Sequence, residues 1–279
     1  MRKIFERLLI IGVTVFYGTS VKGEIISIQS MKEVEEKMQT LLEKRDAHDL
    51  LVAFDVDMTL IQPDHPAVYY PALKQYHKTY KAIMSKMPED QKDLPNVLAL
   101  DLPSRLVEEE IPEIVKNLQK QGVKTIAFTA SLTGKIGKHS RFEVERYRRL
   151  KNFSLSFEHS FSKHSDISLK TCSSHRGNHP IFYKGILSAN GEHGKTTKGG
   201  VLVAFLDHVK FSPKIIVVVD DRKSNLENIE KALRKYDPEI IFVGMEYQGA
   251  FTYEPETISA ENFKMFWEAL VEKAQALPL

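Results

Sequence analysis

Four short, mostly apolar runs constrain the fold of this chain more than any other feature. They cover residues 50–54, 123–128, 214–219 and 240–243, and longer stretches with helical spacing of apolar side chains separate them. A strand that is apolar at nearly every position is buried on both faces, which is typical of parallel strands with helices above and below. We therefore expect an α/β fold with a doubly wound parallel sheet.

The spacing of apolar residues predicts helices between and beyond these runs. Ser30 and Glu33 form a capping-box pattern at the start of the first helix, and Gly122 stands where glycine commonly ends a helix. One further strand is predicted at 181–187. The predicted helices cover about 31–45, 73–87, 104–121, 142–150, 199–209, 224–236 and 261–274.

The first 23 residues have the layout of a secretory signal peptide. A basic start at 1–7 is followed by an apolar run at 8–18 and then by small residues that include Ser20 and Gly23. The run is too short for a transmembrane helix, which needs about 20 apolar residues. We expect an exported protein, periplasmic or secreted, with a signal peptide at 1–23 and no stable membrane span. The alternatives are a buried N-terminal helix or strand and an uncleaved anchor.

The charge of the chain gives no sign of a nucleic-acid partner. Its 279 residues include 39 Lys and Arg against 37 Asp and Glu, so the formal net charge is +2, and the two signs are interspersed. Nucleic-acid surfaces need clustered positive charge. The single cysteine, Cys172, excludes an internal disulfide.

Polar and acidic residues directly follow three of the apolar runs. Asp55 and Asp57 come after the first run, Thr129 after the second, and Asp220 and Asp221 after the third. Ligands of open parallel sheets bind beyond the carboxyl ends of the strands, so these side chains should meet at one edge. Singly, such residues often only cap turns, but their convergence from three strands predicts a functional site.

The spacing of the carboxylates suits phosphoryl transfer. Asp55 can attack phosphorus and form an acyl phosphate, and Asp57 can protonate the leaving oxygen and then deprotonate the attacking water. Two carboxylates beside a phosphate dianion repel each other, and Mg²⁺ suits such an all-oxygen site. Asp55 and Asp221 are the expected metal ligands, with Asp220 as the alternative to Asp221.

Thr129 and Lys198 are the expected donors to the phosphoryl oxygens, one as a hydroxyl and the other as a positive charge. Thr129 could instead cap the start of a helix. Lys195 is the alternative to Lys198, but Lys198 directly precedes Gly199 and the predicted helix.

In their order along the chain, these signatures resemble those of the haloacid dehalogenase-like hydrolase superfamily. They are Asp-x-Asp-x-Thr after a strand, Thr after the next strand, Lys-Gly before a helix and Asp-Asp after a further strand, and they run from Asp55 to Asn225. The resemblance covers about 50–244 and implies a Rossmann-like core, Mg²⁺, an aspartyl-phosphate intermediate and a main-chain carbonyl ligand at Asp57. It also implies the phosphotransfer branch, since Asp57 supplies the second acid. At Asn225 the chain departs from the superfamily, which often has an acid there.

The resemblance also implies a division into domains. Residues 61–121 lie where the superfamily places a helical cap, and such caps close over the site and exclude water. We therefore expect a mainly helical cap insertion at 61–121 and a core formed by 24–60 and 122–279.

Together these features predict a Mg²⁺-dependent phosphohydrolase, a phosphomonoesterase that acts on a phosphorylated small molecule outside the cytoplasm. A phosphotransferase or protein phosphatase would use the same residues. A catalytically silent exported binding or effector protein, or a protein that scavenges phosphate or metal, is the alternative from another class. Asp57 argues against a pure binding role, because binding alone does not require a second acid there.

Overall fold

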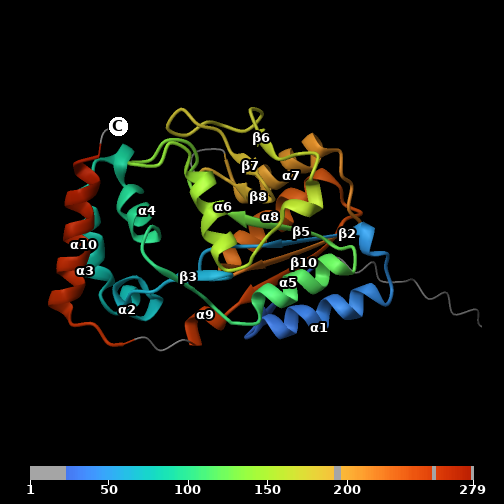
Figure 1. The fold of residues 1–279 in the computed structure, drawn as a ribbon, viewed down its shortest axis with the longest axis horizontal. Helices are drawn as coiled ribbons and strands as arrows, with labels where there is room; N and C mark the ends of the chain where they lie inside the picture. The colour runs from blue at the N-terminus through green and yellow to red at the C-terminus, as the bar shows by residue number, and fades with distance from the viewer. Residues whose placement is uncertain (1–22, 192–195, 253–255, 278–279) are drawn as a thin grey trace, which may run out of the picture.

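The described part of the chain is built around one large sheet. The computed structural model describes residues 23–191, 196–252 and 256–277, so the predicted signal peptide at 1–23 lies, apart from Gly23, outside the described residues. The strands of the sheet are β1 (Glu24–Ile28), β2 (Leu50–Phe54), β5 (Lys124–Thr129), β6 (Asp166–Ser168), β7 (Ile181–Tyr183), β8 (Ile186–Ser188), β9 (Ile215–Asp220) and β10 (Ile241–Tyr247). Their order across the sheet is β1-β10-β9-β2-β5-β8-β7-β6 (Figure 1).

Most neighbouring strands of this sheet run parallel. The pairs from β1 through β10, β9, β2 and β5 to β8 are all parallel. Only two pairs of the described sheet, β8 with β7 and β7 with β6 at one edge, are antiparallel. The predicted α/β fold with a mostly parallel sheet is therefore confirmed.

Helices pack on both faces of the sheet, because successive residues of a strand point to opposite sides. The packing helices are α1 (Met31–Leu42), α5 (Ile111–Lys120), α7 (Lys198–Val209) and α8 (Lys223–Tyr236). Val52 and Val217 point into the hydrophobic cluster that contains α1 and α5. Leu51 and Ile216, their neighbours in sequence, point into the cluster that contains α7 and α8. The strands are thus buried on both sides, as their composition predicts.

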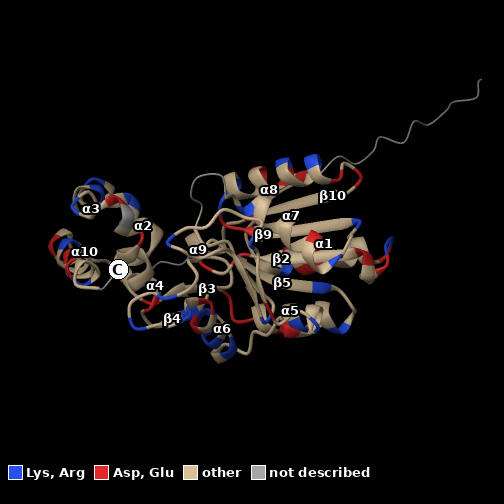
Figure 2. Cartoon of the chain, turned by 90° about the horizontal axis from the view of Figure 1, so that it is seen from above, with Lys and Arg blue, Asp and Glu red and all other residues tan. Residues whose placement is uncertain are grey.

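A second, two-stranded sheet begins a few residues after Asp57. Its strands β3 (Ile61–Pro63) and β4 (Ser104–Leu106) pair in the antiparallel direction, with Ile61 opposite Leu106. The chain between them forms α2 (Tyr70–Gln75), α3 (His77–Met84) and α4 (Leu94–Leu100). In both views α2 and α3 lie beyond one end of the large sheet (Figure 1, Figure 2).

The last helix, α10 (Ala260–Gln275), packs against these inserted helices. Its apolar side joins a third hydrophobic cluster with residues from 67 to 99. Trp267 anchors it by donating its indole N–H to the Ala67 carbonyl at 3.0 Å, and the Tyr76 hydroxyl donates to the Ile258 carbonyl at 3.0 Å. Two segments distant in sequence therefore build one helical layer. Among the described residues, no helix combines the length and apolar composition that crossing a bilayer requires.

These contacts cross the domain boundaries expected from the sequence. The segment 61–121 includes α5, which lies beside α1 on the large sheet. The segment 122–279 includes α10, which contacts α3 and α4. The division into a core and a cap itself stays a prediction.

Several elements differ locally from the expectation. The predicted strand 181–187 is a hairpin, because Lys184 and Gly185 have φ of 47° and 86° and form the two-residue turn between β7 and β8. A side chain at 185 would also clash, since a Cβ there would lie 2.3 Å from the Phe157 backbone. Apolar spacing predicts this type of break poorly, because both strands of the hairpin are apolar.

Helix boundaries also differ. The predicted helix 104–121 is a strand, β4, followed by the shorter helix α5, and the predicted helix 73–87 is broken at Tyr76 between α2 and α3. The helix predicted at 224–236 begins at Lys223. At α1 the expected capping box is present, and the Glu33 carboxylate accepts a hydrogen bond from the Ser30 N–H at 3.0 Å.

We expect Trp267→Ala to destabilise the helical layer by about 3–5 kcal/mol, because the substitution empties a large buried site and leaves the Ala67 carbonyl unpaired. Met265, on the same helix, is 61% exposed, so Met265→Ala should change stability by less than about 0.5 kcal/mol. Urea denaturation with hydrogen exchange of α3, α4 and α10 measures both effects. Equal losses in the two variants would show that α10 does not depend on the Trp267 contact.

Candidate functional site

Three neighbouring strands carry the predicted residues to the same edge of the sheet. β2 lies between β9 and β5, and Asp55 directly follows β2. Its N–H donates to the Val219 carbonyl at 2.8 Å, which extends the strand pairing by one residue. Asp220 is the last residue of β9 and Thr129 the last of β5. The parallel arrangement thus places these side chains together, as expected from their positions after the apolar runs.

Lys198 lies between two of the acids. Its Nζ is 2.9 Å from Asp55 Oδ1 and 2.7 Å from Asp220 Oδ2, and all three side chains are buried. The lysine begins α7, where the Thr197 side chain accepts a hydrogen bond from the Gly200 N–H. Its alternative, Lys195, lies outside the described residues.

Gly199 explains how Lys198 can lie so deep. A Cβ at this position would lie 2.6 Å from the Ala232 Cβ and 2.7 Å from the Asn228 carbonyl oxygen on α8. The Gly199 N–H also donates to the Asn228 side chain at 3.0 Å. Only glycine allows the start of α7 to approach α8 this closely, and that approach fixes the position of the preceding lysine.

Asp220 is surrounded by donors. Besides Lys198, the Asn225 amide donates to both of its oxygens at 3.0 and 3.1 Å, and the Arg222 N–H donates to Oδ1 at 2.9 Å. An acid at position 225 would face this buried carboxylate with a like charge. Asn225 suits this position, because its amide can donate where a carboxylate cannot.

Asp55, Asp220 and Asp221 could hold a cation together. Each offers one carboxylate oxygen, and the three oxygens lie within 4.8 Å of one another. Among the described residues, no hydrogen bond reaches the Asp221 carboxylate. Its oxygens are therefore more available than those of Asp220. An all-carboxylate donor set fits a hard cation such as Mg²⁺.

Burial and the repulsion between neighbouring carboxylates oppose ionisation of the acids at this edge. Burial raises the pKa of Asp55 well above its ordinary value, and Asp220 and Asp221 add to the rise while Lys198 opposes it. Burial and the neighbouring Asp220 raise the pKa of Asp221 to about 7. Burial alone would lower the pKa of Lys198, but Asp220 and Asp55 raise it above its ordinary value. One ammonium does not balance these acids, so a cation would bind favourably.

Asp57 lies beside Thr129 rather than beside the lysine. The turn after Asp57 places Met58 at a φ of 61°, and the Met58 N–H donates to the Ile61 carbonyl at 2.8 Å. The Thr129 hydroxyl donates to Asp57 Oδ2 at 3.4 Å and accepts from the Ser131 N–H at 3.0 Å. Thr129 therefore supports the local turn and also contacts Asp57. It does not cap a helix, since the next described helix begins at Phe142.

Arg146 also contacts Asp57, although it is not among the predicted site residues. It lies on α6 (Phe142–Asn152), is only 2% exposed, and its Nη2 is 2.6 Å from Asp57 Oδ1. Phe142 and Leu150, one turn before and after it, are buried apolar residues. The sequence carried one signal for this contact, since the arginine lies on the apolar side of a predicted helix and a buried charge requires a partner.

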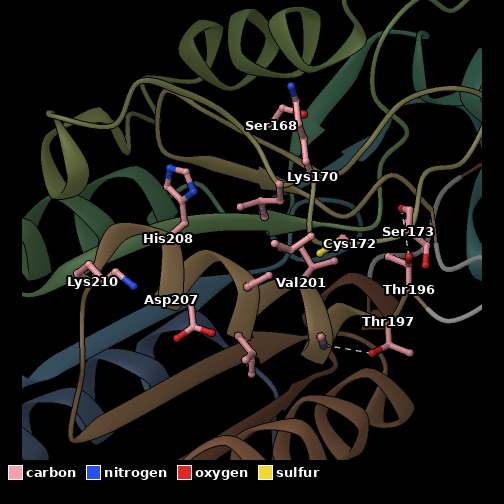
Figure 3. A pocket seen from close by; sticks show the side chains of 15 residues that line it. Ser168, Lys170, Cys172, Ser173, Thr196, Thr197, Val201, Asp207, His208 and Lys210 are labelled. Carbon is pink, nitrogen blue, oxygen red and sulfur yellow. Dashed lines mark hydrogen bonds between the residues drawn. The ribbon is translucent and has the colours of Figure 1, made fainter.

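A hollow lies on another part of the molecule. It has a volume of about 870 Å³ and lies between α7 and the segment 168–173, with Cys172, Val201 and His208 among its lining residues (Figure 3). None of the six predicted site residues is among the described residues that line it. This hollow is therefore separate from the acidic site.

Lys198→Met should lower the free energy of unfolding by about 3–5 kcal/mol, because it leaves two buried carboxylates without their cation. Lys214 offers a matched control, since its Nζ is 2.7 Å from Asp49 Oδ2 but its side chain is 66% exposed. Lys214→Met should cost less than about 1 kcal/mol. Urea denaturation of both variants measures these changes. Equal losses of unfolding free energy would contradict the expectation that the buried ion pairs of Lys198 contribute more than an exposed one.

Asp221 should make the metal-free protein less stable as the pH rises. Its pKa is 3.8 ordinarily and about 7 in the folded chain, so the folded state binds more protons between these values. The stability from this group is present below about pH 4 and is lost as the pH rises to about 7. In EDTA, Asp221→Asn should flatten this decrease in urea denaturation, whereas Glu43→Gln, at an exposed acid, should not. Parallel curves for wild type and Asp221→Asn would contradict the expectation.

The chain is similar in sequence to proteins of the genus Rickettsia. An uncharacterized protein of Rickettsia felis is 28% identical over 263 residues, which cover 90% of this chain and 85% of the relative. An uncharacterized protein of Rickettsia bellii is 26% identical over 240 residues, which cover 81% of this chain and 78% of the relative. No solved structure matches the chain significantly. Residues 26–275 match the family described as "Protein of unknown function (DUF2608)", and because this match covers most of the chain, the protein belongs to that family.

Proposed function

We propose that this protein is a Mg²⁺-dependent phosphohydrolase that acts on phosphomonoesters of small molecules. The observation that carries the proposal is the buried Asp55–Lys198–Asp220 arrangement at the carboxyl edge of the sheet, with Asp57, two residues after Asp55, in contact with Thr129 of the neighbouring strand. A carboxylate held by a lysine, with a second acid two residues later, has the groups that a two-step phosphoryl transfer requires.

The arrangement of the helices supports the finer description of the fold. We propose that the large sheet is a doubly wound, Rossmann-like core and that the helices between β3 and β4 form a cap. β3 begins shortly after the Asp57 turn and pairs with β4, so the segment that carries the inserted helices both begins and ends near Asp57. A cap in this position could exclude water during the reaction.

In the proposed first step, an oxygen of Asp55 attacks phosphorus. The new oxygen–phosphorus bond forms as the bond to the leaving oxygen breaks, and Asp57 supplies the proton to that oxygen. In the second step Asp57 takes a proton from water, the water oxygen attacks phosphorus, and the bond to Asp55 breaks. Inorganic phosphate is released and both acids return to their starting state.

The other residues of the site orient the attacking carboxylate or would bind the phosphoryl group and Mg²⁺. Lys198 orients Asp55 through its 2.9 Å contact, and on substrate binding the Thr129 hydroxyl would donate to a phosphoryl oxygen in place of Asp57. Asp55, Asp221 and the main-chain carbonyl of Asp57 would hold Mg²⁺, with Asp220 close by. When bound, Mg²⁺ would offset the charge of the carboxylates and the phosphoryl group. The excess negative charge of the acids supports this assignment.

We also propose that the protein is exported. The support is the basic start, the apolar run and the small residues in the segment 1–23, which lies almost wholly outside the described residues.

Hydrolysis of p-nitrophenyl phosphate by the purified protein tests the function directly. Turnover should require Mg²⁺ and stop in EDTA, and Asp55→Asn should lower it at least about a thousandfold. Asp49→Asn, which changes an acid outside the site, should retain activity.

Two further measurements distinguish the alternatives. A phosphotransferase would release less phosphate than p-nitrophenol when an alcohol acceptor is present. A well-folded, Mg²⁺-loaded wild type without turnover on a panel of phosphomonoesters would support a binding protein and contradict the proposal.

A further inference from the structure

We propose that Arg146 is the positioning residue of Asp57, a role that rests on the proposed function. Arg146 would hold the carboxylate of the acid–base residue in one orientation during both chemical steps. No sequence signature of the site includes this arginine, which lies 89 residues after Asp57.

The contacts of Asp57 support this role. Arg146 Nη2 lies 2.6 Å from Oδ1, and the Thr129 hydroxyl lies 3.4 Å from Oδ2. The two donors hold opposite oxygens of one carboxylate, so they restrict its rotation. The Asp57 side chain is 27% exposed, so without the arginine it could turn toward solvent.

The burial of Arg146 indicates more than a structural role. Its side chain is 2% exposed, and its buried Nε–H has no hydrogen-bond partner among the described residues. A buried guanidinium kept for stability alone would be expected to use its donors fully. The Asp57 ion pair is therefore the main contact that accounts for a charge at this depth.

Arg149 provides the comparison, because it lies one turn later on the same helix. Its guanidinium donates to the Leu102 carbonyl at 3.1 Å, to Ser104 Oγ at 3.2 Å and to Asp101 Oδ1 at 3.2 Å. These contacts tie α6 to the segment that leads into β4. Arg149 thus anchors α6 to the neighbouring segment, whereas Arg146 contacts Asp57.

The two roles predict different kinetics. A residue that orients Asp57 acts only on the chemical steps, so its loss should lower kcat and leave KM nearly unchanged. A misplaced general acid or base can reduce the rate by about a hundredfold. Removal of Arg146 should lower kcat only when Asp57 is present, because without the Asp57 carboxyl group there is no proton transfer for the arginine to assist.

A double-mutant cycle with p-nitrophenyl phosphate and Mg²⁺ tests this. Arg146→Met should lower kcat about 10- to 100-fold with KM within about twofold, and Arg146→Lys should restore part of the loss. In an Asp57→Asn background, Arg146→Met should change kcat by less than about twofold. Arg149→Met, the control, should have the same effect in both backgrounds.

Failure of the positioning role and failure of the proposed phosphohydrolase give different results. Equal effects of Arg146→Met with and without Asp57, or a change confined to KM, would overturn the positioning role while the phosphohydrolase stands. A wild type that is inactive on phosphomonoesters with Mg²⁺ would overturn the phosphohydrolase and the positioning role together. Circular dichroism of each variant identifies a loss that is due only to unfolding.

Discussion

The ion pairs of Lys198 with Asp55 and Asp220 are the interaction on which the site depends. Two acids at the ends of neighbouring parallel strands are brought together by the strand spacing, and burial makes their repulsion severe. One ammonium between them makes the arrangement possible. The same contacts leave the edge with more negative charge than a single lysine balances, which favours a bound cation.

That ion-pair arrangement is itself held by the packing of two helices. The close approach of α7 to α8 at Gly199 determines how far Lys198 reaches, and Asn225 on α8 donates to the second acid. The core of the sheet and the charges of the site are therefore not independent. A change that separated α7 from α8 would move the lysine and one donor of Asp220 at the same time.

The candidate site also connects to the helical layer beyond the sheet. Asp57 is followed by β3, the segment between β3 and its partner β4 holds α2, α3 and α4, and α10 packs on α3 and α4. The C-terminal helix therefore stabilises a layer whose two connections lie near Asp57. Helix α6 contacts the same region through two arginines. Arg146 contacts Asp57, and Arg149 contacts the segment before β4.

The sequence by itself determined the central strands and the acids at their ends. Apolar runs and the residues that follow them are local features, and parallel strands bring such ends together whatever the rest of the chain does. The meeting of Asp55, Asp220 and Thr129 at one edge of the sheet was therefore predictable, whereas Lys198, expected at the phosphoryl oxygens, lies between the two acids. The hairpin at Lys184 and Gly185 was less predictable, because its two strands together are as apolar as one continuous strand.

Only the tertiary structure decided which distant residues complete these elements. Arg146 meets Asp57 across 89 residues, and Trp267 meets Ala67 across 200 residues. Neither spacing of apolar residues nor a local signature specifies such pairs. They depend on how helices orient once their apolar sides are buried, and that orientation is set by packing of the whole chain.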